Sequence, residues 1–260
     1  SLANQLLKSY KKADLIIANN VYAHVPDILD FTKGIKKLLN KEGVVTIEFP
    51  HILNLLKRNL YDTIYHEHYS YLSLSNVLNI FNRLKLQVFK VEKIGTQGGG
   101  LRVYGSHLNS RFKIHKSVQK NLDEEINFGL QKKSTYKIFQ KKVNINKYNA
   151  LQFLIKKKLE GKKIAAYGAA AKGNTFLNYA GITKDIIEVV FDAAESKQNK
   201  FLPRSHIPII SPSKIKKIKP DIMIILAWNI KDEIIELLKN KYKWSGVVVT
   251  FIPNLQSQKI

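Results

Sequence analysis

Hydrophobic and polar positions along the first 110 residues alternate between the spacing of strands and the spacing of helices. Short apolar runs that end at polar or proline residues predict buried strands, and apolar positions three and four residues apart predict helices. The predicted elements are a strand at 14–19, a helix at 27–40, a strand at 44–49, a helix at 73–84 capped by Ser73, and strands at 86–94 and 100–106. The last two strands flank a glycine turn, so we expect them to pair antiparallel.

The second half of the chain repeats the alternation after a helical stretch. Residues 111–158 are rich in Lys and Gln, contain no proline and have helical periodicity, which predicts one or two long helices. The elements predicted beyond them are strands at 163–167, 186–191, 221–227 and 246–252, with helices from the first of these strands to about residue 179 and at 230–239.

This pattern predicts an α/β fold in three parts. Residues 1–110 form half of an open α/β sheet, 111–158 a helical linker, and 159–260 a second α/β domain.

Composition narrows the class of protein. With 260 residues, of which 45% are hydrophobic, the chain can bury a substantial core. It has no apolar run of about 18 residues and no secretory signal, so we expect no membrane partner and a cytoplasmic location. The absence of cysteine excludes disulfides and thiolate metal sites in this chain.

The formal charge of +23 raises the question of nucleic-acid binding. Nearly all of the positive charge is lysine spread over helical faces, whereas groove-reading proteins rely on arginine for bidentate contacts. We therefore expect no nucleic-acid partner. An anionic substrate such as a nucleotide diphosphate accounts for part of the charge.

The densest chemistry is the run Tyr65-His66-Glu67-His68-Tyr69. Histidine titrates near neutral pH, and a neighbouring carboxylate can orient it, so the run suits proton transfer. A polar loop with satisfied hydrogen bonds is the alternative. His24 follows a predicted strand end, where open α/β sheets bind ligands. We predict no metal site, because these histidines and His51 lack the tight spacing of metal ligands.

A second motif follows the strand at 163–167. Gly168 and Gly173 flank four residues that include Lys172, a spacing that misses both the phosphate loop and the dinucleotide fingerprint. Small residues after a strand still let the backbone approach a ligand, and the following helix offers N–H groups to an anion. The alternative is a tight turn that binds nothing. Asp192 ends the next strand, where dinucleotide folds place an acid for a ribose hydroxyl; an unrelated surface Asp is the alternative.

Taken together, these motifs resemble the sugar C-methyltransferase family over most of the chain. The matching segments are ANNVYAHVPD at 18–27, DTIYHEHYSY at 62–71, GGLRVY at 99–104, AYGAAAKGNT at 166–175, SHIPI at 205–209 and LAWN at 226–229. The resemblance implies S-adenosylmethionine-dependent C-methylation of a nucleotide-linked keto-deoxysugar. It also implies that the first part belongs to a Rossmann-like class I methyltransferase sheet and the last to a Rossmann-like substrate-binding domain.

The resemblance also assigns roles to residues. It implies that His68 is the base that forms an enolate, that Glu67 orients it, that Tyr65 lies near the reacting carbonyl, and that His24 is a second proton-handling group. The cofactor wall implied is Asn19, Asn20 and Val21. The residues implied to bind the nucleotide-diphosphate sugar are Tyr167, Gly168, Lys172, Gly173 and Asn174, with Lys172 facing the diphosphate.

The chain departs from this family in lacking a cysteine cluster and a glycine-rich cofactor loop. We therefore expect it to be a C-terminal portion whose partner is the N-terminal half of the same protein. The main S-adenosylmethionine-binding loop would lie upstream, so we expect weak or no cofactor binding by this chain alone.

Three alternatives stay open. One is a nucleotide-sugar-binding fragment that is catalytically incomplete. Another is a nicotinamide-dependent oxidoreductase, which the missing third glycine disfavours. The third is a basic nucleic-acid-binding protein, for which we expect steep salt dependence.

Overall fold

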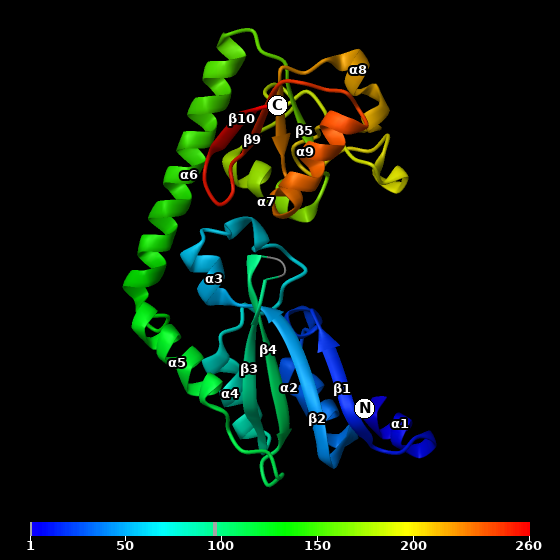
Figure 1. Ribbon diagram of the computed structural model, residues 1–260, viewed down its shortest axis with the longest axis vertical. Helices are drawn as coiled ribbons and strands as arrows, with labels where there is room; N and C mark the ends of the chain where they lie inside the picture. Colours follow the sequence, from blue (N-terminus) through cyan, green and yellow to red (C-terminus); the bar gives the residue numbers. More distant parts are fainter. Residues whose placement is uncertain (1, 96–97) are drawn as a thin grey trace. The chain divides into compact units, whose positions relative to one another are not determined.

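The computed structural model describes residues 2–95 and 98–260, which divide into two compact units (Figure 1). The first unit comprises residues 1–57 and 66–136, and the second comprises residues 58–65 and 137–260. The chain therefore leaves the first unit for a short excursion at 58–65 and returns to it at His66. Each unit has its own sheet and its own hydrophobic core.

The sheet of the first unit has the strand order β1-β2-β4-β3. Its strands are β1 (Ala13–Asn19), β2 (Leu39–Pro50), β3 (Leu86–Ile94) and β4 (Gly100–His107). β1 and β2 are parallel, whereas β4 runs antiparallel to both β2 and β3. Because the parallel pair ends in the same direction, the residues after Asn19 and after Pro50 emerge at one edge of the sheet.

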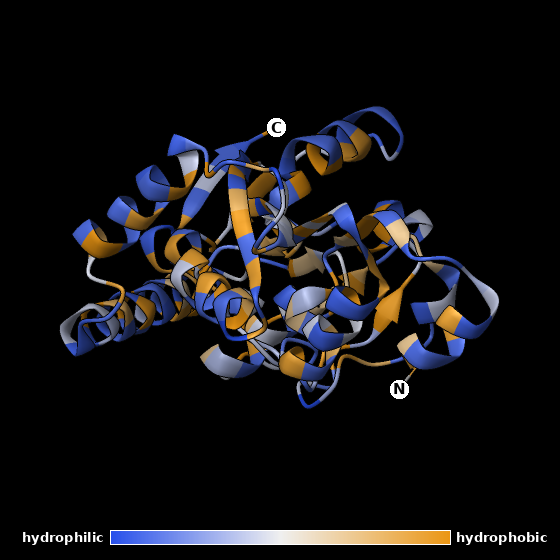
Figure 2. Cartoon of the chain, turned by 90° about the horizontal axis from the view of Figure 1, so that it is seen from below, coloured by the Kyte–Doolittle hydropathy of each residue, from blue (hydrophilic) through white to orange (hydrophobic). Residues whose placement is uncertain are grey.

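The helices of the first unit carry apolar positions, which Figure 2 shows as orange bands on otherwise blue helices, and three of them contact strands of the sheet. The helices of this unit are α1 (Leu2–Ser9), α2 (Ile28–Leu38), α3 (Ile52–Lys57), α4 (Leu74–Arg83) and α5 (Lys116–Phe128). Asp27 caps α2 through the N–H of Asp30, and Ser73 caps α4 as predicted. Fully buried Phe81 of α4 and Phe49 of β2 belong to one core cluster.

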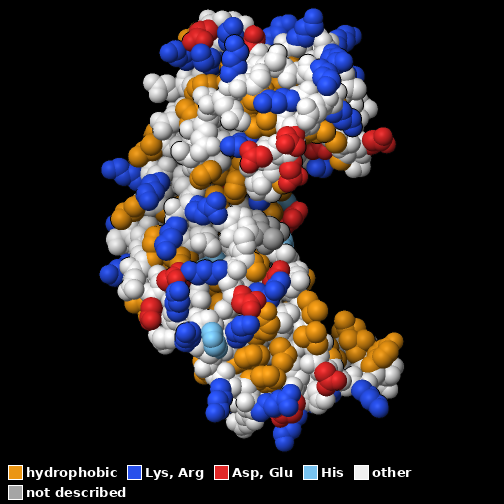
Figure 3. Space-filling model, in the orientation of Figure 1, with side chains coloured by type: hydrophobic (Ala, Val, Ile, Leu, Met, Phe, Trp, Pro, Cys, Tyr) orange, Lys and Arg blue, Asp and Glu red, His pale blue; other side chains and the backbone are white. Residues whose placement is uncertain are grey.

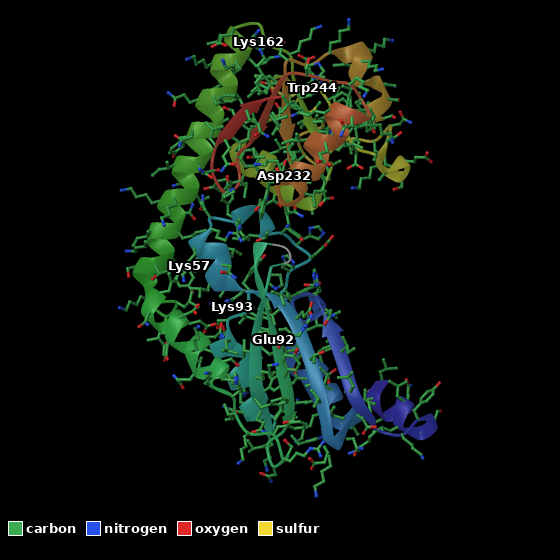
Figure 4. All side chains as sticks on the ribbon, in the orientation of Figure 1. Lys57, Glu92, Lys93, Lys162, Asp232 and Trp244 are labelled. Atoms are coloured by element: carbon green, nitrogen blue, oxygen red, sulfur yellow. The ribbon has the colours of Figure 1, made fainter. Side chains whose placement is uncertain are left out.

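Polar contacts link β3 to α5 and to β4, and two of the β3 residues that make them, Glu92 and Lys93, are labelled in Figure 4. Lys93 pairs with Glu124 of α5, and the N–H of Val91 donates to the hydroxyl of Ser117. Glu92, on the opposite face of the strand, accepts a hydrogen bond from Tyr104 on β4. β3 is thereby held on one face by a helix and along its edge by its neighbouring strand.

The second unit has a six-stranded sheet in the order β10-β9-β8-β5-β6-β7. Its strands are β5 (Ile164–Tyr167), β6 (Val190–Phe191), β7 (Ile209–Ile210), β8 (Ile222–Ile225), β9 (Val247–Thr250) and β10 (Gln256–Lys259). Five of these strands are parallel, and β10 is antiparallel to β9. β5 and β8, buried at every position, lie at the centre and bring the loops that follow them close together.

The helices of the second unit are α6 (Lys133–Leu159, in this unit from Lys137), α7 (Ala171–Ala180), α8 (Ile215–Ile218) and α9 (Lys231–Asn240). α8 and α9 contribute Ile215, Ile234 and Leu238 to a core cluster with Trp244. The indole N–H of Trp244 donates to the carbonyl of Pro220, which satisfies the polar end of a buried ring (Figure 4).

The α/β fold class is confirmed, with two mixed sheets and a helical segment between their sequences. The strand predicted at 186–191 is wrong in length, since β6 is only Val190–Phe191 and residues 183–187 form turns, although Glu188 and Val189 still make backbone hydrogen bonds to β5. β7 and β10 were not predicted, because two-residue and fully polar strands carry no hydrophobic period. The three-part division at 110 and 158 stays a prediction. Over the described residues, no helix is both long and apolar enough to cross a membrane.

Candidate functional site

In the first unit, the segment that carries the histidine-rich motif lies along the end of β1. β1 is followed by Asn20 and the one-turn 3-10 helix η1 (Tyr22–His24). The carbonyl of Ala23 accepts hydrogen bonds from the N–H groups of Tyr69 and Ser70. The His24 side chain reaches the same segment, with its Nδ1 2.9 Å from the Glu67 carbonyl oxygen. These contacts fix the motif at the carboxyl edge of the parallel strands.

The structure brings together two of the predicted catalytic side chains, His24 and His68. Their ring centroids are 4.7 Å apart, and the ring of Tyr71 meets His68 edge-on at 5.9 Å. Both imidazoles are partly exposed, so a ligand can reach them. The hydrogen bond to the Glu67 carbonyl fits a His24 tautomer protonated at Nδ1, which leaves Nε2 as an acceptor. The two imidazoles therefore lie side by side at this edge of the sheet.

Glu67 contributes to this arrangement through its backbone. Its side chain is exposed, and the contact that the structure shows for the residue is the one between its carbonyl and His24. His66 is also exposed. Of the two motif histidines, His68 is thus the one that lies against another imidazole.

The predicted cofactor wall, Asn19, Asn20 and Val21, lies directly beyond β1. Asn20 adopts a left-handed conformation with φ 53° and donates its N–H to the carbonyl of Glu48 on β2. Asn19 and Val21 are exposed. The backbone turn therefore presents two side chains at the sheet edge on which His24 also lies.

Two other polar residues near this edge are engaged in structural contacts. Glu48 is paired with Arg102 across β2 and β4. The Nε2 atom of His51 lies 2.7 Å from a carboxylate oxygen of buried Glu125, which also accepts hydrogen bonds from the first N–H groups of α4. In the described chain, no group of three or more His, Asp and Glu side chains is arranged to hold a metal ion.

In the second unit, the glycine motif forms a tight turn that Asp192 pins in place. Gly168 has φ 94°, a conformation that side-chain-bearing residues rarely adopt, and its N–H donates to the carbonyl of Phe191. The Asp192 carboxylate accepts hydrogen bonds from the N–H groups of Ala169 and Ala194 and contacts Lys197. Asp192 therefore serves the turn itself, because its oxygens are already engaged by protein donors.

α7 begins directly after this turn without a capping side chain among the residues described. Its first-turn N–H groups and the partial positive charge of the helix terminus are suited to an anion. Gly173 lies in this first turn, where close packing leaves no room for a side chain. A Cβ there would lie 2.6 Å from the Cβ of Leu226, which follows β8. Tyr167 is buried in the core beneath the turn, and burial raises the pKa of its phenol.

Asp62, Lys172 and Trp228 form a polar cluster at the start of α7, in which Asp62 is buried and the other two side chains are partly exposed. The indole N–H of Trp228 donates to Asp62 over 2.6 Å, and the ammonium of Lys172 lies 5.1 Å from the centroid of the Trp228 ring. Asp62 is only 1% exposed, and its other carboxylate oxygen has no hydrogen-bond partner in the described structure. Burial raises the pKa of Asp62 and lowers that of Lys172, while each opposite charge partly offsets the shift of the other.

A pocket of 320 Å³ opens next to this cluster, beyond the ends of β8 and β9. Among the residues that line it are Trp228, Asn229, Thr250 and Gln256. Trp228 thus borders both the pocket and Lys172. Asn174, one turn along α7, is partly exposed, and its buried side-chain oxygen has no partner among described residues.

Tyr65 is the last residue of the 58–65 excursion and belongs to the second unit. The excursion contains the 3-10 turn η2 (Tyr61–Thr63) and is anchored there by Tyr61, whose hydroxyl donates to Asn146 of α6, and by Asp62. Asp62 and Trp228 lie within the motifs at 62–71 and 226–229, but the sequence predicts a role for neither. They lie 166 residues apart, and only the tertiary structure reveals their hydrogen bond.

Comparison with known proteins gives a consistent picture. The family described as "C-methyltransferase C-terminal domain" matches residues 95–253, and "Methyltransferase domain" matches residues 2–91. The chain is 32% identical over 241 residues to "C-methyltransferase NovU" of Streptomyces niveus, an alignment that covers 93% of this chain. It spans 57% of the length of that relative.

Solved structures show only a distant similarity. One is the M1.HpyAVI–SAM complex, with 10% identity, coverage of 42% of this chain and 50% of the other, and a TM-score of 0.29. Another is magnesium protoporphyrin IX methyltransferase (ChlM) from Synechocystis PCC 6803 with bound SAH, with 13% identity, coverage of 39% and 48%, and a TM-score of 0.31. At these TM-scores the likeness carries no argument about this chain.

Proposed function

The chain belongs to the C-methyltransferase family, and from that premise we propose that it takes part in S-adenosylmethionine-dependent C-methylation of a nucleotide-linked keto-deoxysugar. The first unit supplies the proton-transfer groups, and the second unit binds the nucleotide diphosphate. The observation that supports this most directly is the pair of imidazoles, His24 and His68, at the carboxyl edge of β1 and β2.

In the proposed mechanism, His68 removes the proton from the carbon next to the sugar ketone. The C–H bond breaks, its electrons form the enolate, and the proton moves to the imidazole. His24 and Tyr65 are the groups we assign to stabilise the enolate oxygen, because a hydrogen-bond donor aimed at developing negative charge lowers the barrier. Glu67 helps to hold the motif through its carbonyl bond to His24. S-adenosylmethionine, when bound, supplies the electrophilic methyl group that the enolate carbon accepts.

The residues that would face the cofactor in this chain are Asn19, Asn20 and Val21. The exposed side chains of Asn19 and Val21 at the end of β1 suit one wall of such a site. The sequence has no glycine-rich loop of the kind that binds the rest of the cofactor. We propose that this loop comes from an N-terminal half of the same protein.

The surface that this half would cover is the open side of β1. Parallel strands are normally covered on both faces. In β1, however, Leu15 and Ile17 on one face are 55% and 62% exposed, while Ala18 on the other is buried. β1 is also an edge strand of its sheet. A neighbouring strand and helix layer would bury this face.

For substrate anchoring we propose the carboxyl edge of the second sheet. The N-terminus of α7, together with Lys172 and Asn174, is assigned to the diphosphate, and Gly168 and Gly173 permit the close approach of backbone. Tyr167 supports the turn from below. The support for this assignment is the uncapped start of α7 beside a half-buried cation.

The test is proton exchange without methyl donor. The chain is incubated in heavy water with a nucleotide-linked 4-keto-6-deoxysugar, and the proton next to the ketone is followed by NMR. Loss of that signal faster than in buffer is the expected result. Binding of the nucleotide sugar without exchange would support the second candidate, a nucleotide-sugar-binding fragment that does no chemistry. Neither binding nor exchange would contradict both.

A further inference from the structure

The outward face of α6 in the second unit carries an apolar seam that the fold does not use. The seam consists of Ile138, Ile145, Tyr148, Ile155 and Leu159, each between 47% and 85% exposed. Isolated exposed apolar residues are ordinary, but these five share one helix stripe, which only Lys141 and Gln152 interrupt. Along α6, Figure 3 shows orange side chains among blue lysines.

The spacing of the seam is that of a coiled coil. With Ile145 at heptad position a, Ile138 and Leu159 also fall at a, and Tyr148 and Ile155 fall at d. The residues that bury α6 against its own unit fall at b, c and f: Asn146, Leu154, Val143 and Ala150. The a/d seam points away from the domain, while on one flank the g residues Asn144 and Lys158 contact their own unit through Tyr179 and Glu188.

The positions that flank the seam are basic or neutral. The e positions are Lys142, Asn149 and Lys156, and the g positions are Lys137, Asn144, Leu151 and Lys158. α6 contains no acidic residue in its 27 positions. Among described residues, Lys158 pairs with Glu188, whereas Lys137, Lys142 and Lys156 take part in no ion pair. Flanking charges at e and g set partner choice in coiled coils.

We infer that α6 is a docking surface for an amphipathic helix of a partner protein with acidic residues at its flanking positions. A second copy of this chain is a poor occupant, because its flanking lysines would face these lysines. A membrane surface is also a poor match, because helices that lie in the membrane–water interface present a broader apolar face than a seam made of two heptad positions. Lys141, at a d position within the seam, likewise favours an acidic partner residue, and Gln152, at an a position, favours a polar one.

The test uses a designed 28-residue helical peptide labelled for fluorescence anisotropy. It has Glu at e and g and Leu at a and d, except for a Glu opposite Lys141 and a Gln opposite Gln152. A scrambled peptide of identical composition is the control. We expect the designed peptide to bind the 260-residue chain at least tenfold more tightly than the scrambled one. The double variant Tyr148→Glu, Ile155→Glu should remove this difference without changing the circular dichroism spectrum.

Matched charge variants separate docking from general attraction to a basic protein. Changing Lys137, Lys142 and Lys156 together to Glu should lower the affinity for the designed peptide at least tenfold. The same charge change at Lys216, Lys217 and Lys239, remote from α6, should have less than a threefold effect at 150 mM salt. Equal losses in both triple variants, equal binding of the two peptides, or self-association of the chain that the seam variant abolishes would overturn the inference.

Discussion

At the residue scale, the buried carboxylates Asp62 and Glu125 differ in the direction of their pKa shifts. Burial alone would raise the pKa of both. Glu125 has a lowered pKa because the His51 imidazole and the N–H groups that begin α4 bind its charged form. Asp62 has a raised pKa because its burial outweighs the indole N–H of Trp228, the more distant Lys172 ammonium and the nearby backbone N–H groups, all of which lower the pKa. Glu125 therefore stabilises the fold through its hydrogen bonds. Asp62 instead belongs to a polar cluster that adjoins a pocket.

The contribution of Glu125 to stability should depend on pH. Its pKa is lower in the folded than in the unfolded chain, so its contribution is complete above the unfolded value of about 4.3 and is lost as the pH falls toward the folded pKa. We expect Glu125→Ala to cost about 3–5 kcal/mol of unfolding free energy at pH 7, measured by urea denaturation, and less at pH 4.

The adjacent Glu124 provides the matched control. It pairs with Lys93 at the surface, so Glu124→Ala should cost about 0–1 kcal/mol. Similar losses in the two variants would contradict a structural role that is particular to Glu125.

The position of Lys172 predicts how nucleotide binding depends on pH. Its pKa is lowered, so the ammonium loses its charge at a lower pH than an exposed lysine does. Lys172→Ala should lower the affinity for a nucleoside diphosphate about 10- to 100-fold at pH 7, as expected for the loss of one charged hydrogen bond. Calorimetry measures this affinity. Asp62→Asn removes a charge that raises the pKa of Lys172. In this variant Lys172 loses its proton at a lower pH, so the affinity for the nucleoside diphosphate should begin to fall at a lower pH than in wild type.

Lys239→Ala, an exposed lysine of α9, serves as the control and should change affinity less than twofold. If Lys172→Ala binds the nucleoside diphosphate as tightly as wild type does, the assignment of Lys172 to the diphosphate is wrong.

At the element scale, α7 packs closely against the segment that follows β8. Gly173 lies where a Cβ would meet Leu226 at 2.6 Å. Gly173→Ala should therefore cost about 1–3 kcal/mol through overpacking, despite the higher helix propensity of alanine. Thermal unfolding followed by circular dichroism measures this change.

Gly34 in α2 is the matched helix glycine, with no atom within 4 Å of the position that a Cβ would take. Gly34→Ala should stabilise the chain by about 0.5–1 kcal/mol. A stabilising Gly173→Ala would show that α7 can move away from Leu226 without cost.

Elements with a clear hydrophobic period were predictable from the sequence, and those defined by tertiary pairing were not. The strand at 14–19 and the helix after Ser73 are found almost as predicted. β10, by contrast, has four polar, exposed residues and exists because its backbone pairs with β9. The proximity of His24 and His68 followed from two strand ends that share one sheet edge. The bond between Asp62 and Trp228 joins positions that no local pattern connects.

At the scale of the whole molecule, the first unit ends in an uncovered apolar face at β1. Exposed apolar edge strands promote association. Ile17→Lys should therefore reduce concentration-dependent self-association in sedimentation velocity, with a change in stability of about 0.5 kcal/mol or less. Ile114→Lys, at an isoleucine that is 65% exposed outside the sheet, is the control and should have no such effect. A chain that stays monomeric at all concentrations would contradict this prediction.

The claim on which the account depends most is that His68 acts as the base. The measurement is exchange of the proton next to the sugar ketone in heavy water, compared between wild type, His68→Gln and the neighbouring exposed variant His66→Gln. We predict that His68→Gln lowers the exchange rate about 10²- to 10⁴-fold and that His66→Gln changes it less than threefold. Both variants should still bind the nucleotide sugar. Exchange that persists in His68→Gln and is lost in His66→Gln would contradict the account.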